Sequence, residues 1–194
     1  MATFQSNYLS SVRKQFAYYR LLGDKTFEQL EDVQLFELPA SNSNSIAIIV
    51  NHLWGNMMSR WTDFLSSDGE KSWRDRDTEF EDIIVDKETM LERWNEGWDC
   101  LFTALDSIDE ENFSTTVYIR NQGHTITEAI NRQLAHYAYH VGQIVFIGRM
   151  YSRQNWNSLS IPKGGSEAYN DQKFAKDRHQ AHFTDEFLNL PDED

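Results

Sequence analysis

Apolar side chains recur at helical spacing over four long stretches of this chain, and few helix breakers interrupt them. In residues 46–65 the apolar positions are three or four residues apart, which places them on one face of a helix. Only 3 prolines and 9 glycines occur in 194 residues, so long helices are favoured over many short strands joined by tight turns. The spacing predicts helices over about residues 7–31, 46–65, 87–108 and from 125 or 127 to about 151.

A short β element is expected directly before the last of these helices. Residues 115–126 alternate around Val117 and Ile119 and then reach a turn-forming run at 121–123, which is typical of a hairpin. Thr125 and Glu128 have the spacing of a capping box, although Thr127 is an alternative cap. Residues 66–82 are charged and aperiodic, and we expect a long exposed connection there.

These elements predict an all-α fold, an antiparallel four-helix bundle with a short β element before the last bundle helix. A chain of 194 residues can bury one substantial core, so we expect a single domain over residues 1–170. Residues 171–194 are expected to form a polar C-terminal tail. The interior of such a bundle is a common location for metal ligands that come from facing helices.

Charge and cysteine content restrict the partners and the compartment. The formal net charge of −13 would repel a phosphate backbone and an anionic membrane surface, so nucleic acid and membrane are not expected partners. A local basic pocket for an anionic small molecule remains compatible with this charge. The single cysteine, Cys100, forms no intramolecular disulfide, and no signal peptide or spanning segment is evident, so a cytoplasmic location is expected.

The segment "NRQLAHYAYHVGQIVF" (131–146) carries two histidines four residues apart in apolar surroundings. Gln133, His136, His140 and Gln143 lie on one narrow stripe of the predicted helix. One turn separates the two imidazoles, at roughly 5 to 6 Å between their Cβ atoms, so both can reach one ion. Hydrogen-bonded core histidines, or chance, would explain the same spacing.

His52, in "IIVNHLWGNMM", is a candidate third ligand because it flanks the apolar face of another predicted helix. For that position alone, a core histidine without a ligating role is the better interpretation, and with the histidine pair available on a neighbouring helix the two interpretations are about equal. The zinc-protease signature is absent, since Tyr137 stands where that motif has its glutamate. Neither a phosphate-binding glycine loop nor a nucleophile elbow is visible.

Four segments together resemble a known family, the DinB/YfiT-like metalloprotein superfamily, and within it a subgroup of uncharacterised function. The similarity extends over nearly all of residues 1–170. The segments are "SIAIIVNHLWGNMMSRWTDFL", "SDGEKSWRDRDTEF", "GHTITEAINRQLAHYAYHVGQIVFIGRMY" and "SLSIPKGGSEAYN".

The resemblance implies a divalent metal ion held by one histidine of the second helix and the paired histidines of the last, which here are His52, His136 and His140. Imidazole ligands suit zinc, nickel, iron and copper, and of these we expect zinc or nickel. Three imidazoles leave coordination positions open, which is typical of catalytic sites. Gln143, Gln133 and either Asn56 or Asn51 are candidates for orienting a ligand or a bound water. Plain hydrogen bonding to buried backbone groups or hydroxyls is an equally good interpretation of these residues.

The reaction is less determined than the metal. Members of the superfamily include transferases and isomerases that use low-molecular-weight thiols, and others identified as hydrolases. We therefore expect a metal-dependent enzyme, a thiol S-transferase or hydrolase acting on a small molecule, and assign no catalytic residue. A stress-response protein that binds a metal or ligand without turnover is the alternative, and a bundle without metal is a third. The resemblance also implies a homodimer.

Overall fold

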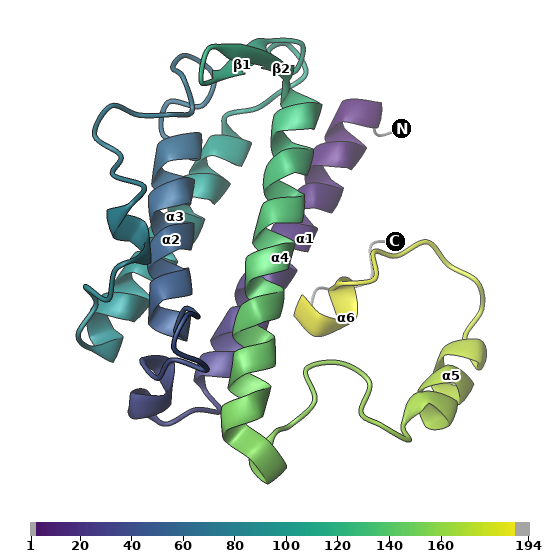
Figure 1. The fold of residues 1–194 in the computed structure, drawn as a ribbon. Helices are drawn as coiled ribbons and strands as arrows, with labels where there is room; N and C mark the ends of the chain where they lie inside the picture. Colours follow the sequence, from purple (N-terminus) through teal and green to yellow (C-terminus); the bar gives the residue numbers. More distant parts are fainter. Residues whose placement is uncertain (1–2, 189–194) are drawn as a thin grey trace.

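The computed structural model describes residues 3–188 and shows four long helices packed as a bundle (Figure 1). A two-stranded antiparallel hairpin precedes the last bundle helix, as the sequence predicted. The predicted all-α bundle with its short β element is therefore confirmed. The elements are α1 (Phe4–Phe27), α2 (Ile46–Trp61), α3 (Lys87–Asp106), β1 (Thr116–Ile119), β2 (Gln122–Thr125) and α4 (Ile126–Ser152).

Side-chain caps determine where the bundle helices begin. Thr3, Ser45, Asp86 and Thr125 each accept a hydrogen bond from a backbone N–H of the first turn. At α4 the reciprocal bond from Glu128 completes a capping box, so Thr125 is the cap rather than the alternative considered from the sequence. Three of the helices end before the predicted residue: α1 at Phe27, α2 at Trp61 and α3 at Asp106.

The helices form two parallel pairs that run in opposite directions. In one pair, Tyr8 of α1 bonds to Asn131 of α4, and Thr26 lies beside Gly148 further along both helices. In the other pair, Trp54 of α2 bonds to Glu96 of α3. The consecutive helices α2 and α3 are parallel because residues 62–86 return the chain to the opposite end of the bundle (Figure 1).

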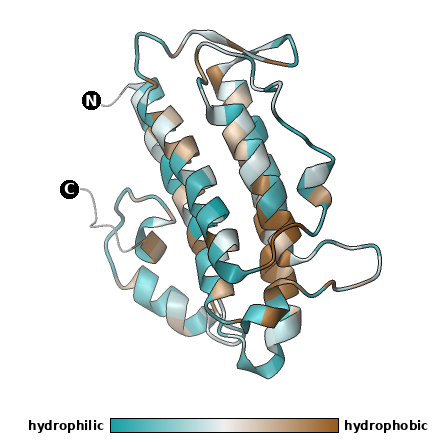
Figure 2. Ribbon diagram, turned by 90° about the vertical axis from the view of Figure 1, so that its left-hand side faces the viewer, coloured by the Kyte–Doolittle hydropathy of each residue, from teal (hydrophilic) through white to brown (hydrophobic). Residues whose placement is uncertain are grey.

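Aromatic side chains from all four helices fill the centre of the core. Phe16 of α1 lies 6.2 Å from Trp61 of α2, 6.4 Å from Trp98 of α3 and 5.8 Å from Tyr137 of α4, measured between ring centroids. The hydroxyl of Tyr137 accepts from the indole of Trp61 at 2.9 Å, so this buried polar group is satisfied. Teal and brown alternate along the helices in Figure 2, as expected when one face is buried.

The connection between α2 and α3 differs from the exposed segment that the sequence predicted. Most of it is irregular, but it contains a short 3-10 helix (Thr78–Phe80), and the side chains of Glu79 and Arg74 are only 5% and 2% exposed. Asn51 of α2 holds this segment against the bundle by donating to the backbone carbonyl of Glu79 at 3.1 Å. One part of a charged, aperiodic stretch is therefore buried against α2.

Residues beyond α4 form two further short helices, α5 (Ser166–Phe174) and α6 (Asp185–Leu188). The second lies against α1, where Asp185 accepts from Lys14 at 3.1 Å and His182 lies 3.1 Å from the Ser11 hydroxyl. The tail is thus attached to the bundle over part of its length. Within residues 3–188, no helix is both long enough and apolar enough to span a membrane.

Candidate metal centre

The two helices α2 and α4 bring together the three histidines that the sequence singled out. His52 comes from α2, and His136 and His140 come from consecutive turns of α4. One ring nitrogen of each lies within 4.8 Å of the others, and the Nε2 atoms of His52 and His136 are 3.3 Å apart. His52 and His140 are buried, and His136 is partly buried.

A carboxylate determines which nitrogen of His52 faces the other imidazoles. Its Nδ1 lies 2.9 Å from Oε2 of Glu79, and Arg74 binds both oxygens of the same carboxylate, at 2.6 and 3.0 Å. Burial alone would raise the pKa of Glu79, but the hydrogen bonds from His52 and Arg74 outweigh burial and lower it. The ionised carboxylate accepts the Nδ1–H of His52, which leaves the Nε2 lone pair facing His136.

A second acceptor orients His140. Its Nδ1 lies 2.8 Å from Oε1 of Gln143, one turn further along α4, and the amide of Gln143 donates to the Tyr139 hydroxyl at 3.2 Å. An amide oxygen can only accept, so Nδ1 of His140 carries the proton and its Nε2 is left with a lone pair.

Burial keeps the two histidines of α4 neutral. It is the main cause that lowers the pKa of His136 to about 3, and the nearby His140 and His52 lower it further. The pKa of His140 falls to about 4, again mainly through burial and then through His52. Neutral imidazole is the form that binds a metal ion, so these residues are in the ligating state near neutral pH.

These observations fit a divalent ion. Three imidazoles converge, and two of them are held by a hydrogen bond at the opposite ring nitrogen, as is usual for histidine ligands of metals. The ring of Phe80 stacks on the imidazole of His52, with ring centroids 4.5 Å apart, and covers one face of that imidazole. Three imidazoles suit zinc and nickel among other ions, and they do not choose between these.

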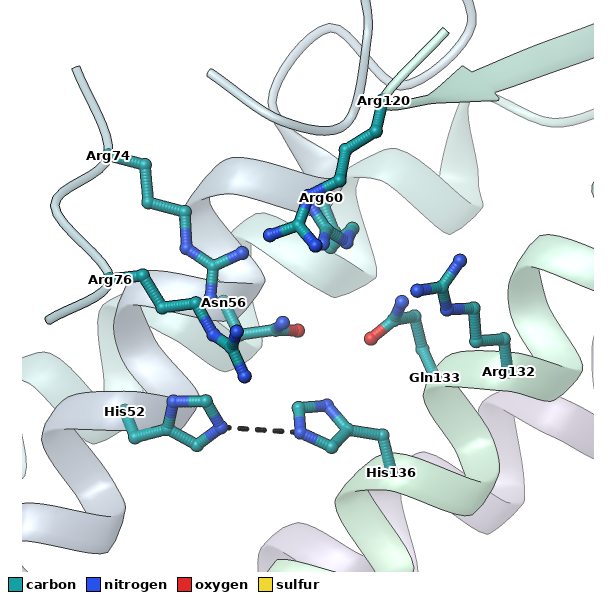
Figure 3. Close-up of a pocket in the computed structure, with 9 residues that line it drawn as sticks. All are labelled: His52, Asn56, Arg60, Arg74, Arg76, Arg120, Arg132, Gln133 and His136. Atoms are coloured by element: carbon teal, nitrogen blue, oxygen red, sulfur yellow. Dashed lines mark hydrogen bonds between the residues drawn. The ribbon is translucent and has the colours of Figure 1, made fainter. Parts of the chain in front are cut away.

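A cavity of about 200 Å³ adjoins the histidines (Figure 3). His52 and His136 lie at one end of it, and the guanidinium groups of arginines from the connection, the hairpin and both helices point toward the same space (Figure 3). Its lining consists of His52, Asn56, Arg60, Arg74, Arg76, Arg120, Arg132, Gln133 and His136.

The structure places the candidate orienting residues in different roles. Gln143 contacts a histidine of the cluster directly. Asn56 lines the cavity and accepts from the Tyr137 hydroxyl at 3.0 Å, so its oxygen is already engaged. Gln133 also lines the cavity, and its Oε1 is buried without a hydrogen-bond partner. The other three histidines of the chain, in β2 and the tail, are not part of the cluster.

Sequence reasoning missed several residues of this site. Glu79 and Arg74 lie in a segment without periodicity, so nothing in the pattern distinguished them from solvated charges. Arg60 gave a usable signal, because it is the one Asp, Glu, Lys or Arg in a helix of mostly apolar residues, and a buried charge there needs a partner. Arg132 is a different case, because from the sequence it is either a contact for an anionic substrate or, more safely, a surface charge; its side chain, although exposed, lines the cavity.

Comparison with known proteins gives one family. Residues 3–165 match the model of a family described as "Protein of unknown function (DUF1572)". No curated protein and no solved structure matches the chain significantly. The matched range includes α1 to α4, all three histidines and every residue that lines the cavity. Because this match covers most of its length, the chain belongs to the DUF1572 family.

Proposed function

We propose that this protein is a DinB/YfiT-like metalloprotein that binds one divalent ion through His52, His136 and His140. The observation that carries the proposal is the convergence of three ring nitrogens within 4.8 Å inside a helical bundle. Glu79 and Gln143 support it, since each holds one imidazole from the side opposite to the other rings. Zinc or nickel is the proposed ion.

Metal content of the untagged protein tests the site. We expect about one equivalent of zinc or nickel in the wild type and a strong loss in His136→Ala, because two imidazoles do not make a stable site. His179→Ala is the matched control, since it removes an exposed tail histidine that is outside the cluster. Equal metal content in the wild type and His136→Ala, or no metal in either, would contradict the proposal.

We further propose an enzyme, a thiol S-transferase or hydrolase type, acting on a small molecule. A divalent ion on three imidazoles supplies a Lewis acid that activates a water molecule or a thiol as the nucleophile. The cavity beside His52 and His136 supports this proposal, since it gives a substrate access to the ligands. None of the nine lining residues is a carboxylate, and both routes, with water or with a thiol as the nucleophile, need only the metal ion.

Conjugation assays separate the enzyme from a protein that binds metal without turnover. The metal-loaded protein is mixed with low-molecular-weight thiols and a panel of electrophiles, and product is followed with and without the ion. We expect metal-dependent turnover that His136→Ala abolishes and His179→Ala retains. Absence of turnover across the panel, with the ion still bound, favours the alternative of a non-catalytic binding protein involved in stress responses.

The homodimer expected from the sequence stays a prediction. Light scattering of the metal-loaded protein tests it, and a homodimer would have twice the chain mass of 22.8 kDa. A mass equal to that of one chain across the working concentration range would contradict it.

A further inference from the structure

The cavity beside the metal centre concentrates positive charge in an acidic protein. Five of its nine lining residues are arginines, whereas the chain as a whole has a formal net charge of −13. Guanidinium groups repel one another at short range, so their clustering needs anions nearby. The carboxylates that contact these arginines show how much of the charge the protein itself balances.

Two glutamates balance part of the cluster. Oε2 of Glu70 lies 3.0 Å from Arg60, 3.4 Å from Arg74 and 3.2 Å from Arg120. Glu79 forms the second pair with Arg74 and also binds His52. The acidic side chains of the protein therefore engage three of the five arginines.

The remaining two arginines contact no carboxylate. Over residues 3–188, neither Arg76 nor Arg132 forms an ion pair with a described acidic side chain, although both guanidinium groups point into the cavity from opposite sides (Figure 3). Arg76 extends from the connection and Arg132 from the first turns of α4. Both line the same cavity, so an anion bound there would lie among guanidinium groups, two of which have no acidic partner within the described residues.

Buried polar atoms at the same cavity also lack partners. Gln133 is only 3% exposed, and its side-chain oxygen Oε1 makes no hydrogen bond. Nε of Arg60 is likewise buried without a partner. Buried polar groups of native proteins are normally satisfied, so unpaired ones that line a cavity indicate a ligand. An anion would accept from Arg60, and its protonated or hydroxyl part would reach Gln133.

We propose that this cavity binds the carboxylate or phosphate group of a small-molecule substrate, with Arg76 and Arg132 as its principal ligands. This inference rests on the proposed metal centre. His52 and His136 lie at one end of the cavity, so an anion bound in the cavity would lie close to the ion. The histidines and the arginines line the same cavity, so an anionic group bound by the arginines places the rest of the substrate beside the histidines. The planar guanidinium group of an arginine can donate two parallel hydrogen bonds to a carboxylate or to a phosphate.

Calorimetric titration of the zinc-loaded protein tests the inference with two probes, inorganic phosphate and succinate. Arg76→Gln and Arg132→Gln are each expected to raise the Kd of the preferred probe about tenfold, because each removes a charged hydrogen-bond donor. Both side chains are exposed, so the variants should fold normally. Arg149→Gln is the matched control, since Arg149 is an exposed arginine on the same helix, about 25 Å further along it.

The outcomes distinguish this inference from the metal centre, because zinc content is measured in every sample. Arginine-dependent binding to zinc-loaded protein supports the inference, and the tighter probe identifies phosphate or carboxylate as the recognised group. Stoichiometric zinc with no probe binding, or with binding that both substitutions leave unchanged, overturns the anion site and leaves the metal centre intact. Absence of zinc overturns the proposed function, and with it the assignment of the cavity to a substrate.

Discussion

Glu79 links the histidine cluster to the arginines of the cavity through a single buried carboxylate. It accepts from His52 on one side and from Arg74 on the other, so both groups depend on its charge and position. A carboxylate behind a ligating imidazole makes the ring a stronger donor and fixes its orientation. The residue is therefore expected to affect metal affinity without itself touching the ion.

Replacing Glu79 by glutamine tests this dependence. The amide keeps an oxygen that can accept from His52 but removes the negative charge, so we expect metal affinity to fall roughly 10- to 100-fold. Competition with a chromophoric chelator measures the affinity, and circular dichroism checks the fold. Glu81→Gln, an exposed glutamate two residues further along, is the control. Equal affinity in the two variants would show that the Glu79 charge is unimportant for the ion.

At this scale the sequence identified the histidines better than their partners. His136 and His140 share a helix face, which spacing shows, and the family resemblance added His52. Glu79 reaches His52 only because an irregular segment folds back over α2, and no local pattern encodes that approach. Partners that come from aperiodic segments require the three-dimensional structure.

Among the secondary-structure elements, α2 makes room for the connection at one glycine. A Cβ atom at Gly55 would lie 2.5 Å from Oε1 of Glu79, which is too close for the side chain to stay where it is. Gly142 on α4 differs, because a Cβ there meets nothing within 4 Å. The two glycines are both inside helices, yet only one is required by packing.

Alanine at each position separates helix propensity from this contact. Gly142→Ala is expected to stabilise the protein by roughly 0.5–1 kcal/mol, since alanine is the better helix former. Gly55→Ala gains the same propensity but displaces Glu79, so we expect lower stability than in Gly142→Ala and weaker metal binding. Urea unfolding and the chelator competition measure the two effects. Unchanged metal affinity in Gly55→Ala would mean that Glu79 adapts without cost.

The middles of the helices were predictable, and their ends were less so. The apolar period of a helix is read over many residues, so one misleading residue does not change the prediction. A helix end depends on one cap or on one change of backbone direction. At the end of α2, Thr62 takes an extended conformation although Phe64 and Leu65 continue the apolar spacing. The apolar pattern continues past the helix because Phe64 packs against Trp61, with ring centroids 4.9 Å apart.

In the whole molecule, the histidine cluster connects the two parallel helix pairs. His52 belongs to the pair formed by α2 and α3, and His136 and His140 belong to the pair formed by α1 and α4. An ion bound by all three would link the two halves of the bundle. Since a ligand that binds only the folded state stabilises it, metal loading should raise the melting temperature.

Thermal unfolding with and without the ion measures this effect. With free zinc at about a hundred times its Kd, the stabilisation is about 2.7 kcal/mol, which corresponds to roughly 5–10 °C in a chain of this size. Treatment with a chelator should reverse the shift, and His136→Ala should not show it. Identical melting temperatures for the metal-loaded and metal-free wild type would contradict the proposed link.

The origin of the arginines has a consequence for how such proteins diversify. The imidazoles, Arg60 and Arg132 come from helices that the core fixes. Arg74 and Arg76 come from the connection and Arg120 from the hairpin turn, where its φ of 55° is unusual for a residue with a side chain. Loops accept substitutions and changes of length more readily than packed helices. Substitutions in the two loops can therefore change three of the five arginines of the cavity while the three histidines on the helices stay in place.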